Sequence, residues 1–150
     1  MSIKYYDWAE HHANFRPNKI ALKDTSLNRD QSYLKLNENA SRFAKFMQEK
    51  HIKKGDRVAL LAYNCIEFFE LLFACGKIGA VLVPLNWRLT EPELKYIVSN
   101  CTPKIFIFDN DFCEISHNII NKCDIKISVE INSNKKVDAY SNELSLHDVN

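Results

Sequence analysis

The chain has 150 residues with 20 basic and 19 acidic side chains, so its formal net charge is only +1 and nothing in the charge pattern indicates a nucleic-acid-binding protein. No stretch of about 18 apolar residues is present to form a transmembrane helix, and the first residues lack the apolar region and cleavage site of a signal peptide. Apolar and charged fractions of 46% and 26% are ordinary for a globular domain, and a chain of this length can bury one continuous core.

The first predicted elements are a hairpin and a long helix. Short extended segments at 20–23 and 31–33 flank a polar turn at 24–30, as in a β-hairpin. A helix is predicted over 32–50 because apolar residues recur there with a period of 3.6 residues. The residues of this apolar stripe are Leu36, Ala40, Phe43, Ala44 and Met47.

A short apolar strand at 58–62 and a second helix at 66–78 come next. Asn64 is predicted to cap this helix, with Glu67 completing a capping box, and Gly79 is predicted to end it in a left-handed conformation. The helix is apolar nearly all round, which predicts that it is well buried.

The second half of the chain continues the alternation of strands and helices. Strands are predicted at 80–85 and 104–108, separated by a helix that a capping box at Thr90-Glu91-Pro92-Glu93 opens. A helix at 111–122 and a half-buried strand at 125–131 follow, and then a turn at 133–136 and a short helix at 142–149. This alternation predicts an α/β fold with a largely parallel sheet flanked by helices.

Sequence motifs for catalysis and metal binding are missing or weak. The three glycines form neither of the common phosphate-binding loops, and no G-x-S-x-G elbow is present. Cys113, His117 and Cys123 offer only three metal ligands, whereas structural zinc normally has four at tighter spacing, so a buried Cys113 and a solvated His117 are the favoured interpretation. The five cysteines are odd in number and lack C-x-x-C spacing, which indicates a reduced, cytoplasmic protein.

Arg88 is the one cation whose position indicates ligand binding. It follows the strand at 80–85, and ligands of parallel α/β sheets bind at the carboxyl ends of the strands. A guanidinium beside the start of the next helix suits a phosphate group. The alternative is a structural ion pair with Glu91 or Asp109. The role of Trp87 also has two interpretations. It could stack on the base of a ligand, although an aromatic residue that covers the end of the sheet is more common.

Five local motifs of the chain occur in the order and spacing of a known family. They are Ser32-Tyr33 with Leu36, Gly55-Asp56-Arg57-Val58-Ala59, Asn64 with Glu67-Phe68, Lys77-Ile78-Gly79-Ala80 followed by Val83-Pro84-Leu85-Asn86, and Asn86-Trp87-Arg88-Leu89-Thr90 with Glu93-Leu94. With these motifs the segment 20–109 resembles the start of the AMP-forming acyl-CoA synthetases and related adenylating enzymes. Lys35 departs from the pattern, which usually has an acidic residue there, and the segment 111–150 resembles the family only loosely.

The resemblance implies that residues 1–150 are the N-terminal part of the large AMP-binding domain of a ligase in fatty acid metabolism. Such enzymes use ATP and Mg to convert a carboxylic acid into an acyl-adenylate and then transfer the acyl group to CoA. Their phosphate loop, ribose-binding aspartate and C-terminal catalytic lysine have no match in the chain, so we expect the fragment to be inactive alone and to hold no cofactor tightly. No catalytic residue is assigned. The arginine of "NxRL" contacts CoA phosphates in some of these ligases, which implies that role for Arg88.

Two other classes of function remain open at this point. One is a freestanding, flavodoxin-like α/β module that binds an anion or nucleotide without catalysis, and the other is an interaction protein that recruits a partner by a sheet edge or an apolar face. The highly apolar central elements also predict that the isolated chain self-associates, most simply as a homodimer. The acyl substrate is not encoded in any motif of this segment.

Overall fold

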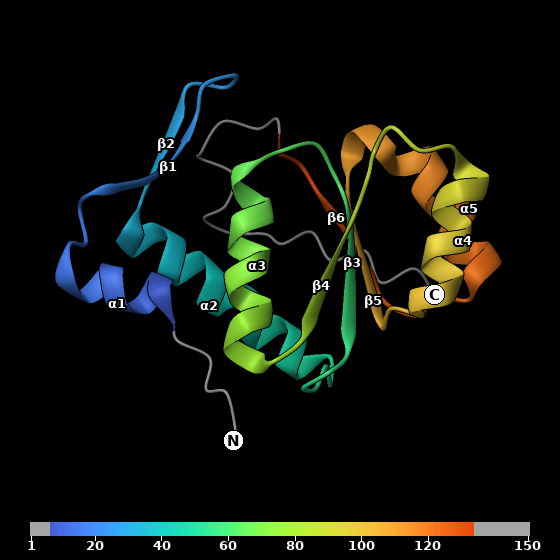
Figure 1. Ribbon diagram of the computed structural model, residues 1–150, viewed down its shortest axis with the longest axis horizontal. Helices are drawn as coiled ribbons and strands as arrows, with labels where there is room; N and C mark the ends of the chain where they lie inside the picture. The colour runs from blue at the N-terminus through green and yellow to red at the C-terminus, as the bar shows by residue number, and fades with distance from the viewer. Residues whose placement is uncertain (1–6, 134–150) are drawn as a thin grey trace. The chain divides into compact units, whose positions relative to one another are not determined.

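The computed structural model describes residues 7–133, which form two compact units (Figure 1). The first unit contains the chain up to Gly55 together with Cys65–Val81. The second contains Asp56–Asn64 and the described residues from Leu82 onward. The predicted turn at 133–136, except for Ser133, and the predicted helix at 142–149 lie outside the described residues.

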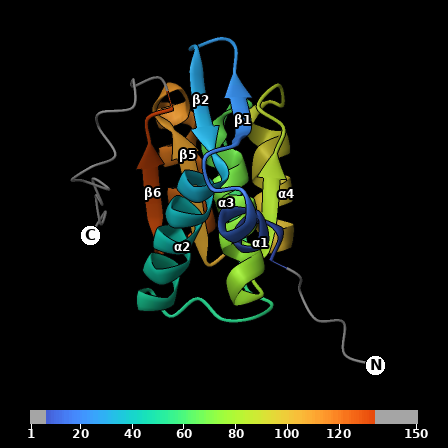
Figure 2. The same ribbon diagram turned by 90° about the vertical axis from the view of Figure 1, so that its left-hand side faces the viewer.

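The first unit is a helical layer with an antiparallel hairpin. Its elements are α1 (Trp8–Phe15), β1 (Ile20–Asp24), β2 (Arg29–Ser32), α2 (Tyr33–Glu49) and α3 (Ile66–Ile78). Strands β1 and β2 pair antiparallel, which confirms the predicted hairpin. Helix α2 packs against both α1 and α3, and Figure 2 shows the three helices beneath the hairpin.

Helix α2 confirms the predicted apolar stripe. The backbone at its N-cap, Ser32, is extended, and the Ser32 hydroxyl accepts a hydrogen bond from the Lys35 N–H at 3.3 Å, so one of the unpaired amides of the first turn is satisfied. All the stripe residues are buried, and Asn39 and Phe46 are buried with them. The apolar period therefore identified the packed face of the helix, but not its buried amide.

Helix α3 differs from its prediction at the start and in its burial. The residue before it is Cys65, with extended backbone and no side-chain cap, so the capping role given to Asn64 was wrong. Gly79 does end the helix, with φ of 73°. The apolar surface is not covered on every side, because Phe69 and Leu72 are 41% and 43% exposed. The residues that are buried include Glu67, which bonds to another element of this unit and not to the helix start.

The second unit is built on a four-stranded parallel sheet. Its strands are β3 (Arg57–Leu61), β4 (Val81–Leu85), β5 (Ile105–Asp109) and β6 (Ser128–Ile131), in the order β4-β3-β5-β6. The pairs β3–β5 and β5–β6 are parallel, which confirms the predicted fold class. Central strand β5 is buried throughout, as expected for a parallel strand. Edge strand β4 is more exposed and contains Pro84, whose missing N–H is tolerated at a sheet edge.

Two helices cover one face of this sheet. These are α4 (Glu91–Cys101) and α5 (Cys113–Cys123), which pack against each other in Figure 1. The predicted capping box is present, since the backbone N–H and hydroxyl of Thr90 both donate to Glu93. The predicted helix at 111–122 instead begins with a 3-10 turn, η1 (Asn110–Phe112). The core between sheet and helices includes Ala59, Leu61, Leu94, Val98, Phe106, Phe108, Ile119 and Ile120.

Between residues 7 and 133, no helix has the length and apolarity needed to cross a membrane.

Candidate functional site

The carboxyl ends of strands β3, β4 and β5 each lead to an aromatic residue. Tyr63 and Trp87 come two residues after β3 and β4, and Phe112 comes three residues after β5. The ring of Tyr63 lies 4.9 Å from that of Trp87 and 4.8 Å from that of Phe112, measured between centroids. We call Tyr63, Trp87 and Phe112 the carboxyl-edge aromatic cluster. Because parallel strands end together at one edge, the topology brings these three distant residues into contact.

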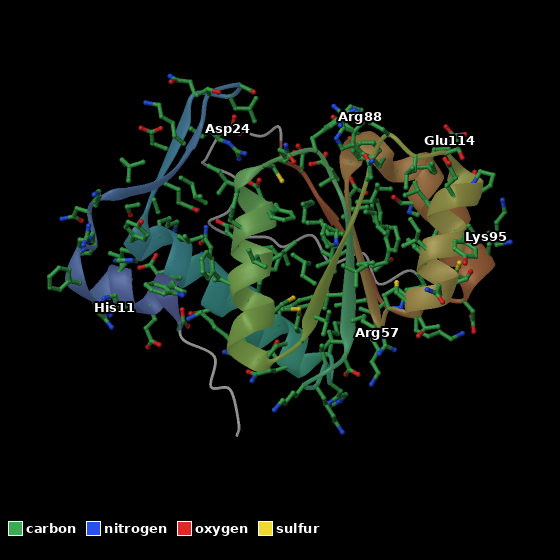
Figure 3. All side chains as sticks on the ribbon, in the orientation of Figure 1. His11, Asp24, Arg57, Arg88, Lys95 and Glu114 are labelled. Carbon is green, nitrogen blue, oxygen red and sulfur yellow. The ribbon has the colours of Figure 1, made fainter. Side chains whose placement is uncertain are left out.

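Arg88 lies beside this cluster in the turn between β4 and α4. The turn is held by Asn86, whose side-chain oxygen accepts from the Arg88 N–H and whose backbone oxygen accepts from the Leu89 N–H, both at 3.0 Å. An Asn side chain that bonds to the backbone two residues on is a frequent feature of such turns. The guanidinium carbon lies 4.2 Å from the ring centroid of Trp87. In Figure 3 Arg88 lies at the end of the sheet opposite Arg57.

The alternative of a structural ion pair between Arg88 and Glu91 or Asp109 is not found in the structure. Glu91 is engaged by Lys122 and by the Asn118 amide, and these two partners lower its pKa. Asp109 accepts hydrogen bonds from the N–H and hydroxyl of Ser133. Among residues 7–133, none forms a hydrogen bond or ion pair with the guanidinium of Arg88.

The arrangement around Arg88 is suited to binding an anion. The side chain is exposed, and the guanidinium carbon lies over the ring of Trp87. A guanidinium that stacks on an aromatic ring does so with its flat face, which leaves the N–H groups in its plane available for other partners. The N-terminus of α4 follows two residues later, and the first turn of a helix adds partial positive charge. Glu91 and Glu93 in that turn offset part of this field, so the guanidinium, and not the helix terminus, is the main positive group of this loop.

The three candidate metal ligands do not come together. Cys113 Sγ lies 3.7 Å from His117 Nδ1, but Cys123 Sγ lies beside Ser99 Oγ at 3.4 Å. Burial and the charge of Glu130 raise the pKa of Cys113, which disfavours the thiolate that a metal needs. Within the described part of the chain, no three His, Cys, Asp or Glu residues are grouped to hold a metal ion. His117 is exposed and Cys113 is half-buried, close to the favoured interpretation.

The carboxyl-edge aromatic cluster was not predicted from the sequence, although Trp87 packs against the core as its usual role suggested. A signal was present, because each ring stands two or three residues beyond the end of an apolar strand. Reading those positions together, and not one strand at a time, would have found the cluster.

Comparison with known proteins places this fold in a family. Residues 9–148 match the AMP-binding enzyme family, and the chain belongs to it. The inhibitor-bound N-terminal domain of FACL13 from Mycobacterium tuberculosis superposes with a TM-score of 0.79 at 31% identity, over 87% of this chain and 34% of that one.

Two curated relatives are CoA ligases. The indoleacetate–CoA ligase of Aromatoleum aromaticum is 34% identical over 106 residues, which are 71% of this chain and 20% of the relative. The 3-oxocholest-4-en-26-oate–CoA ligase of Rhodococcus rhodochrous is 31% identical over 120 residues, which are 80% of this chain and 21% of the relative. The chain thus spans about a fifth of the length of each relative.

Proposed function

We propose that this chain is the N-terminal part of the large domain of an AMP-forming acid–thiol ligase. The enzyme would activate a carboxylic acid with ATP and then transfer the acyl group to CoA. Support comes from the family match over 9–148 and from relatives named as CoA ligases. The described segment supplies scaffold and one binding residue, and the groups that bind ATP and Mg would lie in the rest of the enzyme.

Arg88 is the residue that we assign to CoA, through a contact with one of its phosphates. The observation that carries this assignment is an exposed guanidinium at the carboxyl edge of the sheet with its N–H groups unused among the described residues. A phosphate can accept two parallel hydrogen bonds from one guanidinium, which makes arginine the preferred partner at such a site.

The test is Arg88→Ala in the intact ligase, with each half-reaction measured. Losing one charge-assisted contact should raise the KM for CoA roughly 10- to 100-fold and the KM for ATP much less. Lys95→Ala is the matched control, because Lys95 is an exposed cation on α4. Equal effects on the two half-reactions, or none on either, would show that Arg88 does not bind CoA.

The location proposed for the enzyme is the cytoplasm. None of the five cysteines, all of which lie in the described part of the chain, forms a disulfide, which suits a reducing compartment. The two relatives are named for very different acids, an indole acetate and a steroid acid, so the family likeness leaves the acyl group of this enzyme unassigned.

A further inference from the structure

We infer that Trp87 is a positioning residue for CoA binding, acting by holding the guanidinium of Arg88. This inference rests on the proposed function, since it concerns how the same phosphate is bound. Arginine on an exposed turn samples many rotamers, and a ligand that immobilises it must offset the lost entropy. A surface that orients the side chain before CoA arrives reduces that loss.

The contact between the two side chains is a cation–π interaction. The guanidinium carbon lies 4.2 Å from the centroid of the indole, well inside the usual limit of about 6 Å. Stacking uses the face of the guanidinium, whereas hydrogen bonds to phosphate use its edge. Trp87 and a phosphate can therefore engage Arg88 at the same time, without competing for the same donors.

The indole is itself braced from neighbouring strands. Tyr63, which follows β3, meets it at 4.9 Å with an interplanar angle of 69°, the edge-to-face geometry favoured by aromatic pairs. Phe112, which follows β5, supports Tyr63 at 4.8 Å. Both Trp87 and Phe112 also pack against the buried core of the second unit. The Trp87 ring is thus fixed by the sheet, and the turn held by Asn86 fixes the backbone of Arg88.

The first test replaces Trp87 in the intact ligase and measures steady-state kinetics. Trp87→Leu should raise the KM for CoA roughly 3- to 10-fold, and more than it changes the KM for ATP. Trp87→Phe keeps an aromatic face and should recover most of the wild-type value. Tyr96→Leu is the matched control, because Tyr96 is a highly exposed aromatic residue on α4, and it should leave both constants unchanged.

A double-mutant cycle with Arg88→Met separates this inference from the proposed function. If Trp87 acts through Arg88, Trp87→Leu raises the KM for CoA in the wild type but adds nothing in Arg88→Met. Two results would overturn the inference. Trp87→Leu could raise the KM for CoA equally in both backgrounds, or it could raise it in neither. If Arg88→Met alone still raises the KM for CoA, the proposed function stands in both cases. If Arg88→Met itself leaves the KM for CoA unchanged, the proposed contact between Arg88 and a CoA phosphate is refuted.

A fluorescence measurement on the 150-residue chain tests the contact without any catalysis. The sequence contains two tryptophans, so Trp8→Phe leaves Trp87 as the single emitter. In that background Arg88→Met should change the Trp87 emission, because it removes the cation from the ring, whereas Lys95→Met should not. Identical spectra for the Arg88→Met and Lys95→Met variants would contradict the stacking.

Discussion

Arg29 on strand β2 and Glu67 on helix α3 form a buried ion pair within the first unit. Arg29 Nη1 donates to Glu67 Oε1 at 2.9 Å and Nη2 donates to Oε2 at 3.3 Å, while the side chains are only 5% and 2% exposed. Asp24 of strand β1 also accepts from Nη2 at 3.2 Å. The hairpin is therefore tied to α3 by a two-pronged contact between residues distant in sequence.

Breaking this pair should destabilise the chain strongly. Glu67→Gln keeps the shape of the side chain but leaves Asp24 as the only charged partner of Arg29, and we expect a loss of about 1.5–3 kcal/mol in the free energy of unfolding. Glu49→Gln is the control, because the Lys45–Glu49 pair is exposed and 4.0 Å apart, and its loss should be below about 1 kcal/mol. Urea unfolding measures both variants, and similar losses would contradict the importance of the buried pair.

Glu70, one turn further along α3, should make stability depend on pH. Burial raises the pKa of this carboxyl, and the nearby Glu67 acts in the same direction, although the Asn39 and Gln31 amides and the Arg29 charge act in the opposite one. Folding therefore favours the neutral acid. The contribution of Glu70 to the free energy of unfolding is complete below the ordinary pKa of 4.5. It is lost as the pH rises through the raised pKa of this carboxyl in the folded chain.

Glu70→Gln removes this titration while keeping an amide that can bond to the same neighbours. The variant should match the wild type at acidic pH and become relatively more stable as pH rises. Glu38→Gln, an exposed change on α2, should follow the wild type at every pH. Denaturant unfolding over a range of pH checks this, and parallel curves for wild type and Glu70→Gln would show that folding does not raise the pKa of Glu70.

The two glycines at positive φ should differ in their tolerance of alanine. Gly55 has φ of 86° and open space around its added Cβ, whereas at Gly79, with φ of 73°, a Cβ would lie 3.0 Å from Lys54 Cγ. Gly55→Ala should therefore lose about 1 kcal/mol from backbone strain alone, and Gly79→Ala should lose more. Thermal unfolding of both variants checks the order, and a smaller loss for Gly79→Ala would contradict it.

The apolar period of a helix predicted its packed face well, but it did not predict buried polar groups. Leu36 and Met47 of α2 lie where the stripe placed them. Glu67 was interpreted as part of a capping box because Asn64 precedes it at a suitable spacing. Its true partner, Arg29, is 38 residues away, and no local pattern reports a contact of that range.

For the candidate site, the sequence predicted the loop but not its surroundings. Arg88 was placed between a strand and a helix because both elements have clear local signals. The partner of Glu91 proved to be Lys122, on the later helix α5, so the choice between a free and a paired Arg88 depended on tertiary packing. Tyr63 and Trp87 likewise come into contact because β3 and β4 are neighbours in the sheet. The alternation of strands and helices along the sequence does not specify that strand order.

Self-association of the isolated chain remains a prediction. Phe69 and Leu72 on α3 and Val81 on β4 are each more than 40% exposed, and β4 is an edge strand. Exposed apolar surface and unpaired strand edges both favour pairing with another molecule. Sedimentation equilibrium should show a mass that rises with concentration towards a dimer, and Leu72→Lys should weaken this rise. A monomeric mass at all concentrations would refute the prediction.

The most direct test of the proposed ligase is carboxylate-dependent exchange of labelled pyrophosphate into ATP. It should be measured for the product of the whole coding sequence that contains these 150 residues and, in parallel, for the 150 residues alone. We predict that the whole product catalyses exchange and then forms a thioester with CoA, while the 150-residue chain catalyses none. Robust exchange by the purified 150-residue chain, or failure of the whole product to activate any carboxylic acid, would contradict the proposed function.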